Sequence, residues 1–323
     1  MTTYIKEYGQ NIELLSSDPS NPTLGQIWYN TTSKTLKGFR ASAGGTWTTA
    51  NAMAVGKSSG AAAGTQSATL QFGGRTAGGT PLFFGEAQKY NGTSWTTDAN
   101  SMITPRGALG GCGTQTAAVA FGGFSYPPFV LHSATETYNG TSWATSPASL
   151  PATVYNGGSF GTQTAAVSCG SGTSQVTNNW NGSAWTASGN MIVGRNEMGN
   201  AGTQTAGLIF SGNPNDVPIR QATEKYNGTS WTSSGNFGSG RYAMGSSGTQ
   251  TAALAFGGGF PTSGLTEQFN GSTWSAKNNM GTAFYQLRGA GNITNTVAFG
   301  GTTGGASQTA AEEWNPEETI AIF

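Results

Sequence analysis

Short apolar runs separated by glycine or polar turns fill most of the chain. Between residues 100 and 146, TQTAAVAF ends at Gly122-Gly123 and is followed by Ala134–Tyr138 and Thr141–Thr145, while a further run precedes them near Thr104–Gly110. Short runs bounded by glycine-rich turns are typical of β-strands. The pattern therefore predicts four antiparallel strands in this segment.

The last two of these strands flank Asn139-Gly140. Asn-Gly is the strongest short hairpin signal, because a type I′ turn needs a positive φ at both central residues. The sequence thus predicts a type I′ hairpin here. The same dipeptide recurs at Asn91, Asn181, Asn227 and Asn270.

The four-strand pattern repeats along the chain. The tripeptide Gly-Thr-Gln begins at Gly64, Gly113, Gly161, Gly202 and Gly248, with a degenerate sixth copy at Gly291. An aromatic residue followed by Asn, and a tryptophan, recur with the same spacing, the latter as Trp47, Trp95, Trp143, Trp185, Trp231 and Trp274. One such sheet cannot bury both of its faces alone, whereas sheets stacked radially cover one another. The repeat therefore predicts an all-β chain folded as a β-propeller of four-stranded antiparallel blades.

The repeat resembles the kelch motif in its double glycine after the second strand, the Tyr of its third strand and the Trp of its fourth. The double glycine stands at Gly73-Gly74, Gly122-Gly123, Gly257-Gly258 and Gly300-Gly301, and the third and fourth repeats depart from it. Chain length favours seven blades, the first built from irregular N-terminal residues. Six blades is the alternative, with Trp47 on the outer strand of the last. We expect residues 1–25 to be an attachment segment that could add a strand to the first blade, and residues 26–323 to form the propeller.

Charge is scarce: 9% of the residues are charged and the formal net charge is zero. A neutral chain offers no basic field for nucleic acid or for an anionic membrane surface, so neither is expected as a partner. No apolar run is long enough for a membrane span, and no signal peptide is evident. Two cysteines and one histidine predict neither a disulfide framework nor a multi-histidine metal site.

Two ladders of charged residues follow the repeat. An arginine precedes the inner region in three repeats (Arg106, Arg195, Arg241), and a glutamate stands on the third strand of the same repeats (Glu136, Glu224, Glu267). The third repeat lacks both, which indicates that the two side chains meet. The favoured interpretation is a structural Arg–carboxylate pair; a cationic ring gripping an anionic sugar or phosphate is the alternative.

Sites for catalysis are sparse in the sequence. A glycosidase needs two carboxylates across one bond, and Glu197 and Glu224 lack a supporting motif. We therefore expect that the chain is not an enzyme and that it has no catalytic residue, no cofactor and no metal.

The loops after the second strand vary most, and variable loops on a rigid scaffold are where binding residues gather. They carry a set of aromatic and charged candidates for ligand or partner binding: Phe83, Phe84, Phe124, Tyr126, Phe129, Asp216 and Arg220. Aromatics on such a face suit sugar rings or a protein partner.

The segments ATEKYNGTSWTSSGN, GTQTAALAFGG and LGQIWYNTTSKTLKGF are similar to bacteriophage tail-fibre and virion-appendage proteins. That resemblance implies a non-enzymatic structural protein in the virion, made in the host cytoplasm. It would contact other virion proteins through its N-terminal region, with a host surface glycan and a homo-oligomer on the particle as further options. The alternatives are a cellular carbohydrate-binding, lectin-like propeller and, third, a glycan-cleaving enzyme.

Overall fold

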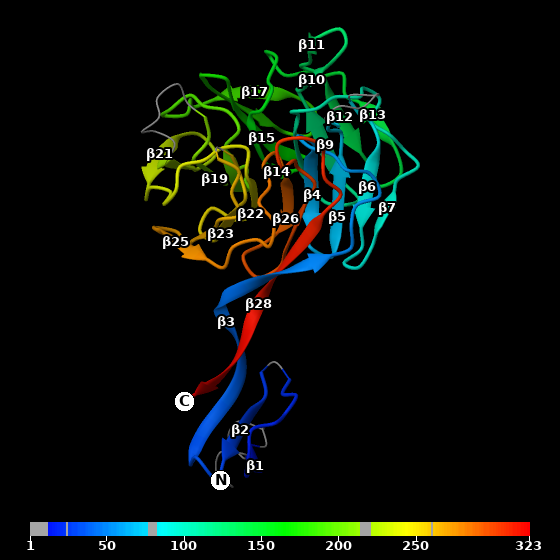
Figure 1. The fold of residues 1–323 in the computed structure, drawn as a ribbon. Coiled ribbons are helices and arrows are strands. Elements are labelled where there is room, and N and C mark those ends of the chain that lie inside the picture. The colour runs from blue at the N-terminus through cyan, green and yellow to red at the C-terminus, as the bar shows by residue number, and fades with distance from the viewer. Residues whose placement is uncertain (1–11, 24, 77–82, 214–220, 260) are drawn as a thin grey trace. The chain divides into compact units, whose positions relative to one another are not determined.

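The computed structural model describes residues 12–23, 25–76, 83–213, 221–259 and 261–323. Its regular structure in these ranges is entirely β, in agreement with the sequence, and five blades are four-stranded antiparallel sheets (Figure 1). No helix of the described residues is long and apolar enough to cross a membrane. From the inner strand outward, the five blades are β4(Ala61–Thr65)–β5(Ala68–Phe72)–β6(Ala87–Tyr90)–β7(Trp95–Thr97), β8(Gly110–Gly113)–β9(Ala118–Phe121)–β12(Thr135–Tyr138)–β13(Trp143–Thr145), β14(Gly158–Thr162)–β15(Ala165–Ser171)–β16(Ser174–Trp180)–β17(Trp185–Ser188), β18(Gly199–Thr203)–β19(Ala206–Phe210)–β20(Thr223–Tyr226)–β21(Trp231–Ser234) and β22(Gly245–Gly248)–β23(Ala253–Phe256)–β24(Thr266–Phe269)–β25(Trp274–Lys277).

The sixth blade combines both ends of the chain. It contains β26(Arg288–Gly291), β27(Thr296–Phe299), the start of β28(Ala311–Ile322) and the end of β3(Thr35–Ala50). The inner strands contact one another in a closed circle, with β26 beside β4. The propeller thus has six blades, and the favoured count of seven is wrong because Trp47 completes the last blade.

The inner strands are displaced from the expected position. The sequence placed the inner strand of the second blade near Thr104–Gly110, but β8 begins at Gly110. Glycine-rich segments have a low strand propensity, so the sequence does not reveal this strand. Glycine is nevertheless required in it, because a larger side chain would clash with the neighbouring blade. A Cβ built on Gly111 would lie 2.6 Å from the Phe72 ring of the preceding blade.

A ring of six residues in the left-handed conformation surrounds the start of the inner strands. These residues, with φ between 52° and 58°, are Ser59, Ala108, Asn156, Glu197, Ala243 and Gln286. Each backbone N–H donates to the carbonyl of the preceding member, at 2.6–3.1 Å, and Ser59 donates to Gln286. Six bonds therefore close a backbone circle, which we call the hydrogen-bonded ring.

The Asn-Gly hairpins differ from the type I′ expectation. Only the glycine has a positive φ, and four residues separate the paired Tyr138 and Trp143. The Asn139 Oδ1 atom instead accepts the backbone N–H groups of Thr141 and Ser142, at 3.0 and 2.8 Å. The side chain thus adds two hydrogen bonds to the backbone bond from Asn139 N–H to the Ser142 carbonyl, at 3.2 Å, and stabilises the turn.

The glutamine of Gly-Thr-Gln joins neighbouring blades. The Gln250 Nε2 donates to the carbonyls of Gly207 and Tyr226 in the preceding blade, at 3.0 and 2.7 Å. Four further glutamines do the same: Gln66, Gln115, Gln163 and Gln204. In the degenerate sixth copy this position is Ile293.

The chain divides into two compact units, Trp47–Asn315 and a smaller unit of Met1–Thr46 with Pro316–Phe323. In the smaller unit β1(Glu13–Leu15) pairs in parallel with β2(Ile27–Asn30), which pairs antiparallel with β3. The Asp18 carboxylate accepts bonds from Trp28, Asn30 and Lys37. Those bonds, led by Lys37, lower the pKa of Asp18 to about 2. The attachment role of residues 1–25 stays a prediction.

Candidate functional site

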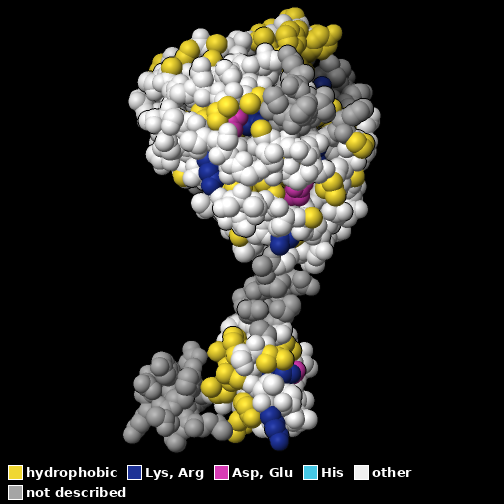
Figure 2. Space-filling view, turned by 90° about the vertical axis from the view of Figure 1, so that its left-hand side faces the viewer, with side chains coloured by type: hydrophobic (Ala, Val, Ile, Leu, Met, Phe, Trp, Pro, Cys, Tyr) yellow, Lys and Arg dark blue, Asp and Glu magenta, His cyan; other side chains and the backbone are white. Residues whose placement is uncertain are grey.

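The loops between second and third strands open on the same face as the hydrogen-bonded ring, because the second strand runs antiparallel to the first. In the second blade this loop forms a hairpin of β10(Phe124–Ser125) and β11(Val130–Leu131). Hydrophobic side chains gather at the top of Figure 2, where Figure 1 places this hairpin. A groove of about 150 Å³ lies here, which we call the aromatic groove. Its lining is Arg75, Thr76, Phe83, Phe124, Tyr126 and Phe129.

The aromatic groove has a buried floor and an exposed rim. Phe83 is buried and contacts Phe124 edge to face, with ring centroids 5.2 Å apart. The Phe124 ring also contacts Phe129, at 5.3 Å. Tyr126 and Phe129 leave 53% and 59% of their surface exposed. The inner rings therefore support Phe129, while the exposed faces of Phe129 and Tyr126 stay open to a ligand.

The structure brings four of the predicted loop residues together and leaves one apart. Phe83, Phe124, Tyr126 and Phe129 line the aromatic groove, whereas the Phe84 ring lies 5.1 Å from the Lys57 Nζ atom. The predicted Asp216 and Arg220 lie outside the described residues.

Arg75 connects the aromatic groove with the hydrogen-bonded ring. Its Nη2 atom donates to the Gln286 Oε1 atom at 3.2 Å. The guanidinium is thus oriented by a ring residue of the sixth blade while it lines a groove between the first two blades. Sequence analysis had not selected Arg75, since it belongs to no ladder.

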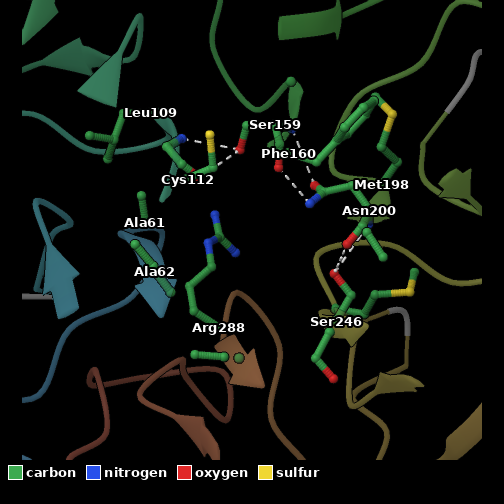
Figure 3. A pocket seen from close by; sticks show the side chains of 18 of the residues that line it. Ala61, Ala62, Leu109, Cys112, Ser159, Phe160, Met198, Asn200, Ser246 and Arg288 are labelled. Carbon is green, nitrogen blue, oxygen red and sulfur yellow. Dashed lines mark hydrogen bonds between the residues drawn. The ribbon is translucent and has the colours of Figure 1, made fainter. Parts of the chain in front are cut away.

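A second hollow, of about 180 Å³, occupies the centre of the inner strands, and we call it the central channel. Three polar side chains join neighbouring inner strands along it. The Ser159 hydroxyl bonds Gly111, the Asn200 amide bonds Ser159, and the Ser246 hydroxyl bonds Asn200 (Figure 3).

Arg288 extends into the central channel from β26 (Figure 3). Its Nε atom donates to the Gly60 carbonyl at 2.6 Å and its Nη1 atom to the Leu287 carbonyl at 2.9 Å. Burial lowers the pKa of Arg288 to about 10, against the opposing effect of Glu197, so it stays charged at neutral pH. Burial likewise raises the pKa of Glu197, although Arg288 and Arg75 favour its charged form.

The Arg and Glu ladders form three buried ion pairs. Their N–O distances are 3.1 Å for Arg106–Glu136, 2.7 Å for Arg195–Glu224 and 2.6 Å for Arg241–Glu267. Each pair lies within one blade, and every side chain is at most 7% exposed. Glu224 is thus engaged in an ion pair and does not line the central channel, whereas Glu197 does. The arrangement supports the structural interpretation of the ladders.

The other candidate groups are separate from one another. Cys112 and Cys169 are buried free thiols whose pKa values are raised by burial. The His132 ring shares a hydrogen bond with the Ser125 hydroxyl, and its pKa is lowered chiefly by burial. In the described ranges no three His, Cys, Asp or Glu side chains cluster as a metal site would require.

Comparisons with known proteins support the assignment of the fold. No protein-family model matches the chain, and no curated protein matches it. The solved structure of YjhT is similar, with a TM-score of 0.69 at 13% identity, over 84% of this chain and 99% of that one. The chain is a β-propeller. At this identity the likeness shows the fold, so no activity or residue role is transferred from YjhT.

The same match corrects the functional expectation. YjhT is likewise a β-propeller, and at 13% identity this likeness bears on the fold alone. The expectations of a bacteriophage virion structural protein and of a chain that is no enzyme are therefore withdrawn, because the match to YjhT supports neither of them.

Proposed function

We propose that this propeller acts on glycans and that the aromatic groove holds a sugar ring. The observation that carries the proposal is the meeting of four aromatic rings and one guanidinium on a loop face. Binding sites are concave, mainly apolar, and carry a few placed polar groups. Aromatic faces pack against the apolar faces of sugar rings, and guanidinium and phenol groups bond hydroxyls.

The rim and floor of the groove have separate parts in this proposal. Tyr126 and Phe129, which are more than half exposed, would stack on the ligand. Phe124 supports Phe129 from below and is itself packed against Phe83. Arg75, oriented by Gln286, supplies donors at one wall.

Binding to a glycan array, followed by calorimetric titration of the best glycan, tests the proposal. We expect Tyr126→Ala and Phe129→Ala to weaken binding about tenfold or more, since exposed aromatic anchors are worth roughly 1–3 kcal/mol. The matched control is Ile192→Ala, because Ile192 is 46% exposed in another blade. A reducing-end assay on the bound glycan reports any cleavage. Equal binding by the groove variants and the control would refute the assignment.

A further inference from the structure

Arg288 breaks the symmetry of the inner strands. It pairs with Phe299 at the register where the other inner strands place Ala61, Gly110, Gly158, Gly199 and Gly245. Those small residues leave room for the ring or thiol of the neighbouring strand, as at Gly158, whose added Cβ would lie 2.8 Å from the Cys169 Sγ atom. The sixth blade thus directs a guanidinium into the central channel from a register at which the other five blades have only glycine or alanine.

The guanidinium is fixed on one side and open on the other. Backbone carbonyls of Gly60 and Leu287 accept from Nε and Nη1. The Nη2 atom has no hydrogen-bond partner among the described residues, and Glu197, which acts on Arg288 electrostatically, forms no ion pair with it at contact distance. An immobilised guanidinium with a free edge is well suited to an oxyanion, since little freedom is lost on binding.

The channel around Arg288 has room for such a ligand. Its hollow of about 180 Å³ exceeds the share of a single water several times. Ala62, with its small side chain, and Gly289, with none, leave space beside Arg288, whereas Ser159, Asn200 and Ser246 use their polar atoms on neighbouring strands. The open cation is therefore the strongest unassigned polar group in the hollow.

We propose that the central channel binds a small oxyanion, a carboxylate or a tetrahedral phosphate or sulfate, on the free edge of Arg288. This site is separate from the aromatic groove and does not depend on the glycan proposal. Glu197 at the ring limits the charge of the ligand, because a carboxylate in the same hollow opposes a highly charged anion.

Thermal unfolding and calorimetry at constant ionic strength, with chloride replaced by acetate, phosphate or sulfate, test this site. A ligand that binds only the folded state raises Tm with its concentration, so we expect a saturating rise for the wild type. A response to acetate alone identifies a carboxylate site, and a response to phosphate or sulfate alone identifies a tetrahedral one.

Two variants separate charge from space. Arg288→Gly restores the residue found in the second to fifth blades, and Ala62→Leu fills the hollow while leaving the charge. We expect both to weaken oxyanion binding at least tenfold, whereas Lys34→Gly, which removes an exposed cation elsewhere, leaves it unchanged. No anion-specific response in the wild type, or equal binding by Ala62→Leu and the wild type, would overturn the site. If Arg288→Gly fails to fold, Arg288→Gln serves in its place.

Discussion

The indole Nε1 of Trp185 donates to the Thr135 hydroxyl of the preceding blade, at 2.8 Å, and both residues are buried. The same bond joins Trp231 to Thr177, Trp274 to Thr223 and Trp47 to Thr266. At the two remaining junctions the threonine is replaced by Ala87 and Ala311, which occupy the same register. There the Trp143 and Trp95 indoles are buried without a partner.

Restoring the missing hydroxyls should stabilise the propeller. We expect Ala87→Thr and Ala311→Thr each to raise the free energy of unfolding by about 1 kcal/mol, the usual net value of a buried hydrogen bond. Denaturant titration measures the change. A loss of stability in both variants would show that these junctions are too tight for a threonine.

Removing an existing hydroxyl gives the reverse experiment. We expect Thr135→Ala to cost about 1–3 kcal/mol, because it leaves the Trp185 indole buried and unpaired. Thr135→Ser keeps the hydroxyl and should retain most of the stability. Equal losses in the two variants would assign the effect to the lost methyl group.

Each glutamine that bonds two carbonyls of the preceding blade acts as a clamp between blades. The junction between the fifth and sixth blades lacks this clamp, because Ile293 occupies the position of the glutamine. We expect Ile293→Gln to reach the carbonyls of Ala253 and Phe269, which match the acceptors of Gln250, and to add about 1 kcal/mol. Hydrogen exchange at β26 and β23 should slow. Unchanged exchange with an unchanged midpoint would contradict the clamp.

The buried ion pairs should matter for stability. We expect Arg241→Ala to cost about 3–5 kcal/mol, because it leaves the Glu267 carboxylate buried without its cation. The double variant Arg241→Met with Glu267→Leu should recover much of that loss. Unchanged melting together with lost glycan binding would instead assign the ladder to the ligand.

Lys57 makes stability depend on pH in the alkaline range. Burial lowers its pKa from 10.5 to about 8, against the raising effect of Glu86. Between these values the unfolded chain binds a proton that the folded chain lacks, so stability rises with pH. From pH 8 to 9.5 we expect a gain of about 1–2 kcal/mol relative to Lys57→Met. Parallel pH profiles of the two proteins would exclude this origin.

Sequence periodicity predicted the blades well where side chains alternate. The third strand expected at Ala134–Tyr138 is observed as Thr135–Tyr138, and the Arg and Glu ladders meet as their covariation indicated. The inner strands were displaced because a strand such as Gly110–Gly113 has almost no side-chain pattern. Arg288 could not be selected from the sequence for a related reason. It is notable because it occupies a register at which the other inner strands have glycine or alanine, and that register is known only from the structure.

The sixth blade ties the first residues of the propeller to the last. Trp47 on β3 leaves the ribosome early, and β28 follows only after every other blade has been synthesised. Five blades therefore wait with an unclosed edge at each end, a state in which exposed strand edges invite pairing with other chains. The circle can close only after the start of β28 has been synthesised, so a chain that ends before Ala311 would remain open and aggregation-prone.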